Sequence, residues 1–142
     1  IERKHRRIIV RKIPDKTQAS VLKALRGIER GYGARRFRRI FKTITVDNGS
    51  EFLDFEALEA SEFSKQQRTQ IFYAHPYSSW ERGSNENANR MIRRFVAKGR
   101  DIARFTHQAV RDIEAWINNY PRRILDFMTP NEMFMKELKA IS

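Results

Sequence analysis

The order of the secondary-structure patterns is the feature of this sequence that most restricts its fold. Runs rich in β-branched or aromatic residues occur before residue 75, at Arg7–Ile13, Phe41–Val46 and Thr69–Ala74, and each run predicts a strand. Apolar residues at helical spacing separate the first two runs, and the chain after residue 84 is patterned for helices alone. This order predicts an α/β fold in which helices pack against a sheet.

Capping residues locate the predicted helices. In the first half, Asp15 is expected to cap the helix that follows it. One later helix is expected from about Ser84 to Val96, and the next begins at a Thr106 N-cap. The last helix opens with Thr129-Pro-Asn-Glu132, where Thr caps, Pro takes the first helical position and Glu completes a capping box. No repeat or linker interrupts the chain, so residues 1–142 are predicted to form one domain.

Two further expectations concern packing. Trp116 and Tyr120 fall at core spacing on the helix that follows Thr106, and we assign them to the core. The stretch from Pro76 to Ser84 is rich in Pro, Ser and Gly, which predicts a poorly packed loop.

The balance of charge indicates the kind of partner. The 142 residues contain 29 Lys and Arg against 17 Asp and Glu, which gives a net charge of +12. So large an excess argues against an acidic solubility module or an ordinary metabolic enzyme. It favours a polyanionic partner, nucleic acid before a membrane surface.

Absent features exclude several classes of protein. The chain contains no Cys, which excludes disulfide frameworks, thiolate zinc sites and Cys nucleophiles. No apolar run approaches the roughly 18 residues of a transmembrane helix, and no signal-peptide pattern opens the chain. We therefore expect a cytoplasmic protein.

Asp47 is the first candidate for chemistry. It directly follows the strand predicted at Phe41–Val46, and open α/β sheets place ligands at the carboxyl ends of their strands. Asp47-Asn-Gly49 is also typical of a tight turn, and for the isolated tripeptide the turn is the commoner meaning.

Glu86 is the second candidate, because of its neighbours on the predicted helix. The apolar face of that helix consists of Ala88, Met91, Ile92 and Phe95. Glu86 lies opposite, beside Asn89, Arg90 and Arg93, and a carboxylate among such groups suits a metal ligand next to phosphates. The alternative is a surface pair of Glu86 with Arg90, worth only a few tenths of a kcal/mol.

Several motifs occur in an order that is typical of one protein family. They are Thr45-Val-Asp-Asn-Gly-Ser-Glu-Phe52, His75-Pro-Tyr77, Trp80-Glu-Arg-Gly-Ser-Asn-Glu-Asn87, Ile92-Arg-Arg-Phe95, Lys98-Gly99, Asn118-Asn-Tyr-Pro-Arg-Arg-Ile-Leu125 and Met128-Thr-Pro130. Together these motifs resemble the bacterial insertion-element transposases, and within them the insertion sequence thirty-type group. The catalytic core of that family is shared with retroviral integrase.

The resemblance implies a ribonuclease H-like mixed sheet flanked by helices, with an Asp-Asp-Glu triad that holds two divalent cations, Mg²⁺ or Mn²⁺. By position, Asp47 matches the second acidic residue and Glu86 the third. The implied partner is DNA, both element ends and target, bound by a nucleoid-associated protein that is homo-oligomeric at full length. The residues expected to contact DNA are Arg82, Asn89, Arg90, Arg93 and Lys98.

The first Asp of the triad has no counterpart by this resemblance. In the family it lies on the strand before the segment that corresponds to residues 1–6, so we expect an N-terminally truncated core, inactive alone. The acidic residues before position 47 are Glu2, Asp15 and Glu29. Glu2 falls at the wrong strand position, Asp15 is interpreted as the cap, and Glu29 as a helix-surface residue.

The sequence alone leaves three functions open. The first is the catalytic core of a DNA transposase, which hydrolyses a phosphodiester at the element end and uses the freed 3′-hydroxyl to attack target DNA. The second is a non-catalytic nucleic-acid-binding or assembly module of the same fold. The third is a basic RNA-binding protein of ribosomal type. Asp47 and Glu86 favour the first over the third, because RNA binding alone requires no such carboxylates.

Overall fold

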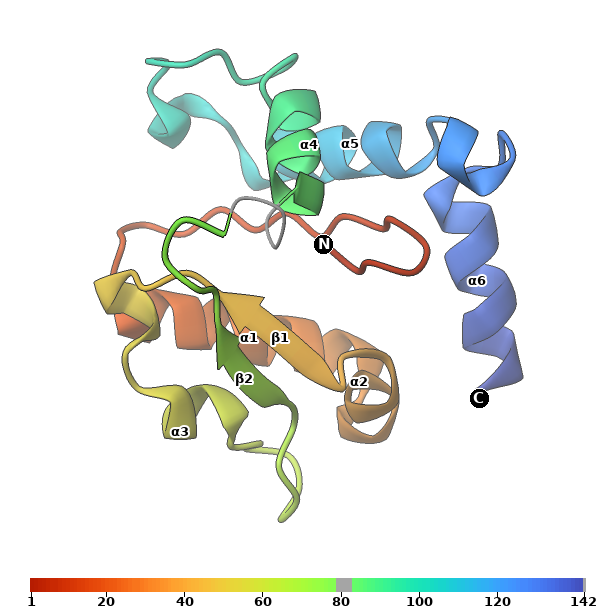
Figure 1. Cartoon of the computed structure of the whole chain (residues 1–142). Helices are drawn as coiled ribbons and strands as arrows, with labels where there is room; N and C mark the ends of the chain where they lie inside the picture. The colour runs from red at the N-terminus through yellow and green to blue at the C-terminus, as the bar shows by residue number, and fades with distance from the viewer. Residues whose placement is uncertain (79–82, 142) are drawn as a thin grey trace. The chain divides into compact units, whose positions relative to one another are not determined.

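The computed structural model describes residues 1–78 and 83–141 (Figure 1). The chain divides into two compact units. We call Ile13–Ser78 the strand unit, and Ile1–Lys12 together with Ser79–Ser142 the helical unit. The prediction of a single domain over residues 1–142 stays a prediction.

The strand unit contains a parallel pair of strands among its helices. Its elements are α1 (Gln18–Tyr32), α2 (Ala34–Ile40), β1 (Thr43–Val46), the 3-10 helix η1 (Ser50–Phe52), α3 (Phe55–Glu59) and β2 (Gln70–Tyr73). Thr43 is opposite Gln70 and Val46 is opposite Tyr73. The strands predicted at 41–46 and 69–74 are therefore confirmed, and the crossover between them carries α3.

The N-cap of helix α1 lies two residues after the predicted cap. It is Thr17, whose hydroxyl accepts the Ser20 N–H, and Asp15 accepts hydrogen bonds from the Thr17 and Ser20 hydroxyls instead. The prediction that Asp15 is the N-cap is wrong. Asp15 supports the capping hydroxyl rather than the backbone, because the helix starts at Gln18. Helix α1 ends at Gly33, whose φ of +82° suits a residue without a Cβ.

Glu29 is completely buried, so its interpretation as a helix-surface residue is wrong. Its carboxylate lies 3.2 Å from Nη1 of Arg68, which is itself only 2% exposed, and it accepts a hydrogen bond from the Ser61 hydroxyl. Burial lowers the pKa of Arg68, while Glu29 acts in the opposite direction. A buried charge is tolerated where a counter-charge meets it, and Arg68 supplies that charge from a segment 39 positions further along the chain.

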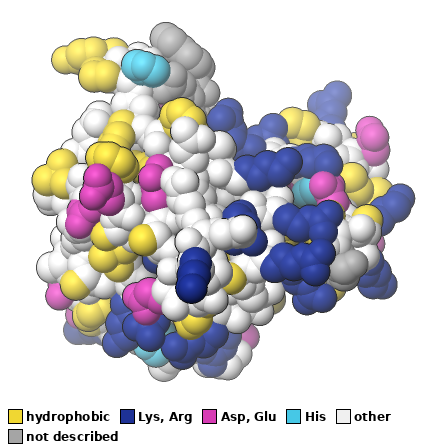
Figure 2. All heavy atoms as spheres, turned by 90° about the horizontal axis from the view of Figure 1, so that it is seen from below, with side chains coloured by type: hydrophobic (Ala, Val, Ile, Leu, Met, Phe, Trp, Pro, Cys, Tyr) yellow, Lys and Arg dark blue, Asp and Glu magenta, His cyan; other side chains and the backbone are white. Residues whose placement is uncertain are grey.

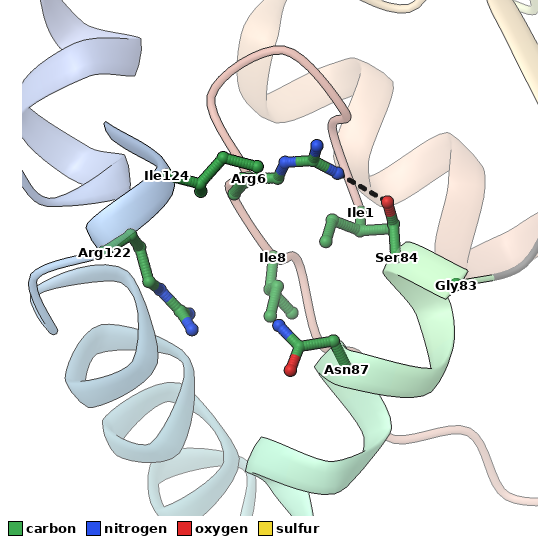
Figure 3. A pocket seen from close by; sticks show the side chains of 8 residues that line it. All are labelled: Ile1, Arg6, Ile8, Gly83, Ser84, Asn87, Arg122 and Ile124. Carbon is green, nitrogen blue, oxygen red and sulfur yellow. Dashed lines mark hydrogen bonds between the residues drawn. The ribbon is translucent and has the colours of Figure 1, made fainter. Parts of the chain in front are cut away.

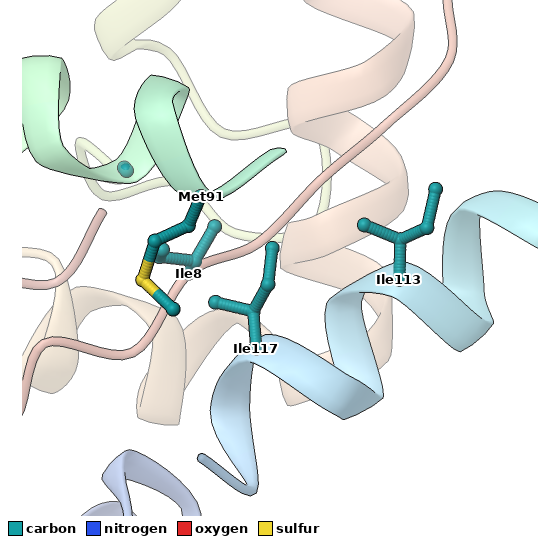
Figure 4. Close-up of a cluster of buried hydrophobic side chains, with 5 residues drawn as sticks. Ile8, Met91, Ile113 and Ile117 are labelled. Carbon is teal, nitrogen blue, oxygen red and sulfur yellow. The ribbon is translucent and has the colours of Figure 1, made fainter. Parts of the chain in front are cut away.

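The helical unit is built around an apolar cluster. Its elements are α4 (Gly83–Ile92), η3 (Ile102–Arg104), α5 (His107–Asn118), η4 (Arg123–Leu125) and α6 (Pro130–Ala140). The buried cluster consists of Ile8, Ala88, Met91, Ile113 and Ile117 (Figure 4). Ile8 brings the N-terminal segment against α4 and α5, so the two ends of this unit share one core.

The strand predicted at Arg7–Ile13 is wrong, because none of these residues joins a ladder in the described structure. Oδ1 of Asn118 accepts the Ile8 N–H at 2.9 Å, and its Nδ2 donates to the Ile8 carbonyl at 2.8 Å. Glu114 accepts the Val10 N–H at 2.8 Å. Side chains of α5 therefore take the place of a neighbouring strand.

The caps of the helical unit follow the sequence closely. Thr106 caps α5 and Thr129 forms the predicted capping box with Glu132, so both predictions are confirmed. Helix α4 ends at Ile92, before the expected Val96.

Trp116 and Tyr120 do not belong to the core, which corrects the prediction. They are 40% and 44% exposed. Trp116 packs against Phe95 and Tyr120, with ring centroids 4.9 and 5.1 Å apart. These aromatics form a surface row, because the inner face of α5 is taken up by Val110, Ile113 and Ile117.

The α/β class is thus confirmed at the level of elements. Within the described residues the sheet has two strands that run parallel, so the mixed sheet expected from the resemblance is not seen there. None of the described helices is long and apolar enough to cross a membrane.

Candidate functional site

Asp47 lies where the sequence predicted, immediately after the last residue of β1. The strand pairing continues beyond the sheet, because the Ala74 N–H donates to the Val46 carbonyl at 2.8 Å. Asn48 Nδ2 donates to the Ala74 carbonyl at 3.2 Å. The loop after β1 is therefore fixed to the residue that follows β2, at the carboxyl edge of the parallel pair.

The Asp47 carboxylate lies at this edge of the strand pair and also stabilises the turn that follows it. Its Oδ1 accepts the Gly49 N–H at 3.0 Å, which is the local hydrogen bond expected of an Asp-Asn-Gly turn. Asp47 is half-buried. The turn interpretation is thus correct in part, and it holds the carboxylate in one place at the strand end.

A second carboxylate lies beside Asp47, and the sequence analysis gave it no role. Glu51, in η1, is 8% exposed. A Cβ placed on Gly49 would lie 2.5 Å from Oε2 of Glu51 and 2.9 Å from Oδ1 of Asp47. The two carboxylates therefore both lie against Gly49, closer than a side chain at position 49 would allow. The only signal in the sequence was the position of Glu51 within the motif Thr45–Phe52.

Glu86 lies in the first turn of α4, within the helical unit. It is exposed, whereas Ala88 and Met91 on the other side of the helix are buried. The predicted division of this helix into a polar and an apolar face is confirmed for these residues. A carboxylate in the first turn is also favoured by the positive end of the helix dipole.

The residues expected to contact DNA can be located for four of the five positions. Asn89, Arg90, Arg93 and Lys98 are exposed. Arg90 donates to the Asn87 side chain at 2.7 Å, which restricts its guanidinium. Arg82 lies outside the described residues.

The structure leaves the pairing of the two candidate carboxylates untested. Asp47 belongs to the strand unit and Glu86 to the helical unit, so their approach to each other stays a prediction. Among the described residues, no group of three or more His, Cys, Asp or Glu side chains could hold a metal ion. In the described part of neither unit do three such side chains come together as a complete triad would require.

A pocket of about 230 Å³ opens beside the first turn of α4 in the helical unit (Figure 3). Its polar lining consists of Arg6, Ser84, Asn87 and Arg122, and the described residues that line it include no acid. Arg6 donates to the Ser84 hydroxyl at 2.5 Å. Burial lowers the pKa of Arg122, which donates to the Ile117 carbonyl at 3.2 Å. Two guanidinium groups beside a helix N-terminus suit an anion.

Part of the surface has the same character. Lys and Arg side chains gather over part of the face seen in Figure 2, and Asp and Glu side chains are fewer on that face. The net charge of +12 is therefore displayed at the surface, where it attracts polyanions over distances of about 10 Å at ordinary ionic strength.

Comparison with known proteins identifies relatives over nearly the whole chain. The chain is 36% identical over 128 residues to the transposase for insertion sequence element IS4351 of Bacteroides fragilis, a match that covers 90% of this chain and 36% of the relative. It is 30% identical over 133 residues to the transposase InsI for insertion sequence element IS30A of Escherichia coli, with 94% and 32% covered. The chain is related to insertion-element transposases. The resemblance seen in the motifs is thereby confirmed, the insertion sequence thirty group included.

A third relative extends this relationship. The probable transposase for insertion-like sequence element IS1161 of Streptococcus salivarius is 32% identical over 134 residues, which cover 94% of this chain and 35% of the relative. No family model matches the chain. The transposase-related chain spans about a third of the length of the curated relatives that it matches.

Proposed function

We propose that this chain is part of the catalytic core of a DNA transposase with a ribonuclease H-like fold. The full-length protein would hydrolyse a phosphodiester at the element ends and join the freed 3′-hydroxyl to target DNA. The observation that carries the proposal is Asp47, held at the carboxyl end of a parallel strand in a chain related to transposases. We expect a homo-oligomer at full length, because most soluble oligomers are symmetric assemblies of one kind of chain.

Asp47 and Glu86 are the residues that would hold the divalent cations, Mg²⁺ or Mn²⁺. Carboxylate oxygens are the hard ligands that these cations prefer. The loop after β1 suits such an ion, because carboxylate oxygens of Asp47 and Glu51 both lie close to Gly49. When bound, a pair of such ions activates an attacking oxygen and stabilises a leaving one.

The chain's own cations would bind and orient the nucleic acid. Arg90, Arg93 and Lys98 are exposed on α4 and the segment after it, and Arg82 and Asn89 complete the predicted set. Arg6 and Arg122 add two guanidinium groups at the neighbouring pocket of the helical unit. These groups would hold backbone phosphates, which positions a strand without reading its sequence.

Duplex binding by the 142-residue chain tests the DNA-binding part of the proposal. Binding should be mostly electrostatic, so if about 5 phosphates are neutralised, log K falls with log salt at a slope of roughly −4 to −5. Fluorescence anisotropy of labelled duplexes over a salt series measures the slope. A flat titration, or no binding at low salt, would contradict the proposal.

Catalysis is tested on the full-length protein, because the relatives are about three times as long as the matched region. Asp47→Asn and Glu86→Gln should each abolish metal-dependent nicking of element-end DNA, since both substitutions keep the shape and remove the charge. Glu56→Gln, which removes an exposed charge on α3, is the matched control and should leave nicking intact. The 142-residue chain by itself is expected to show no strand transfer.

The non-catalytic module remains the competing function, and the same assay separates the two. Binding of DNA by the full-length protein without any metal-dependent cleavage would favour the module. Tighter binding to structured RNA than to element-end DNA would favour the RNA-binding alternative.

A further inference from the structure

Glu51 carries a buried charge that its surroundings in the strand unit do not satisfy. Its residue is 8% exposed, and within the described part of the chain Oε2 has no hydrogen-bond partner. Oε1 lies 3.6 Å from Nζ of Lys16, whose side chain is 75% exposed. A pair at this distance with so exposed a partner contributes little. A buried carboxylate with one unsatisfied oxygen calls for an explanation, because such groups are rare and costly.

The groups around Oε2 of Glu51 point to the missing partner. A Cβ on Gly49 would lie 2.5 Å from Oε2 of Glu51 and 2.8 Å from its carboxyl carbon. The same Cβ would lie 2.9 Å from Oδ1 of Asp47. The unsatisfied oxygen of Glu51 and Oδ1 of Asp47 therefore both approach the position that a Cβ at residue 49 would occupy, which places the two carboxylates close to each other.

Gly49 is not required by its backbone conformation. Its φ of −65° and ψ of 148° are available to any residue. A side chain at position 49 is excluded instead by the two carboxylates, because its Cβ would lie too close to their oxygens. The absence of a side chain thus allows two carboxylates to lie close together, an arrangement that a cation stabilises and that repulsion otherwise opposes.

We propose that Glu51 is a further ligand of the divalent cation held by Asp47, of the hard class to which Mg²⁺ and Mn²⁺ belong. The proposal rests on the proposed function, because it takes the metal role of Asp47 as its starting point. It deepens that function by assigning a carboxylate beyond the Asp-Asp-Glu triad. The loop from Asp47 to Glu51 then supplies two ligands within five residues, arranged around Gly49.

The first experiment measures Mn²⁺ binding to the 142-residue chain, by electron paramagnetic resonance of the free ion with Mg²⁺ as competitor. Weak but saturable binding is expected. Glu51→Gln should weaken it roughly tenfold, because the site loses one charged ligand. Gly49→Ala should weaken it as well, since the methyl group displaces the Glu51 carboxylate without straining the backbone. Glu56→Gln, an exposed carboxylate five residues away, should change the affinity less than about twofold.

A second measurement, of the melting temperature, does not require tight Mn²⁺ binding. In EDTA, Glu51→Gln should raise the melting temperature, because it removes an unsatisfied buried charge. If Glu51 served only to pair with Lys16, both Glu51→Gln and Lys16→Gln would lower it. With Mn²⁺ added, the melting temperature of the unsubstituted chain should rise, and that of the Glu51→Gln chain should not.

The outcomes separate this inference from the function on which it rests. If Asp47→Asn weakens Mn²⁺ binding and Glu51→Gln leaves it unchanged, the inference is overturned and the metal role of Asp47 stands. If neither substitution changes the binding, both fail. Absence of Mn²⁺ binding by the unsubstituted chain overturns the inference, whereas nicking by the full-length protein then decides the proposed function separately.

Discussion

Two segments of this protein share a β-branched composition and use it in different ways. Thr43–Val46 becomes β1, whose backbone pairs with β2. The segment around Ile8 and Val10 binds its backbone to the side chains of Asn118 and Glu114 on α5 instead. Both segments bring apolar side chains inward, and they differ in what satisfies their N–H and C=O groups.

The difference shows what a β-branched run does and does not specify. Branching at Cβ favours an extended backbone and alternate burial of side chains. It does not select the partner, because a buried amide group needs only some acceptor at the right distance. Strand pairing depends on backbone that every sequence has, whereas the contacts of the N-terminal segment depend on two particular residues. Substitutions should therefore affect the two segments unequally.

The largest change in the free energy of unfolding is expected at a buried ion pair of the strand unit, because this unit also depends on particular side chains. Arg68 lies two residues before β2 and pairs with the buried Glu29. Glu29→Gln should lower the free energy of unfolding by about 3–5 kcal/mol, because it leaves a buried guanidinium without its counter-charge. Urea denaturation followed by circular dichroism measures this. If the backbone ladder alone held the unit, the change would be small.

The control for that substitution is a surface pair in the same unit. Glu62 lies 2.8 Å from Arg26, and both side chains are about half exposed. Glu62→Gln should change the free energy of unfolding by less than about 1 kcal/mol, because exposed ion pairs are weak.

Next in size is the substitution Asn118→Ala, which tests the N-terminal segment directly. Asn118 is 2% exposed and bonds both the N–H and the C=O of Ile8. Removing the amide leaves two buried backbone groups without a hydrogen-bond partner, so the free energy of unfolding should fall by about 2–4 kcal/mol. Hydrogen exchange should show lost protection of the Ile8 amide first. The exposed Thr45→Ala in β1 keeps its ladder hydrogen bonds and should cost under about 1 kcal/mol.

A smaller effect is expected at the other contact of the same segment. Glu114 accepts hydrogen bonds from the Val10 N–H at 2.8 Å and from Arg11 at 2.7 Å. Glu114→Ala should lower the free energy of unfolding by about 1–2 kcal/mol, because the Val10 amide is only partly shielded from water. Full additivity with Asn118→Ala in denaturation experiments would show that the two contacts act independently, and would argue against one cooperative segment.

The smallest effect is a pH dependence at the end of α6. A hydrogen bond from Lys4, with smaller contributions from its charge and from His5, lowers the pKa of Glu137 below its usual 4.5. The folded state therefore gains stability from this group above about pH 4.5, and loses it as the pH falls through the lowered value. Glu137→Gln should reduce the loss of stability between about pH 5 and pH 3. Urea denaturation midpoints across that range measure this pH dependence. An unchanged pH profile would show that the Lys4 contact does not stabilise the folded state.

Some features of the candidate site could be predicted from the sequence, and others could not. Asp47 was located from its place after a β-branched run, because parallel strands end at a common edge. The polar face of α4 followed from helical periodicity, which depends only on residues close in the sequence. Glu51 was missed, because the role of a residue in a loop depends on where the turn aims its side chain.

The sequence by itself determined the extended segments, most helix caps, the α/β class and the relationship to transposases. These features depend on local propensity, or on motifs that can be compared directly. The tertiary structure decided which extended segment pairs as a strand, that Glu29 is buried against Arg68, that Trp116 and Tyr120 face outward, and that Glu51 lies beside Asp47 at Gly49. Each of these depends on residues distant in the sequence or on the course of a turn, since burial and electrostatic pairing are properties of the folded chain.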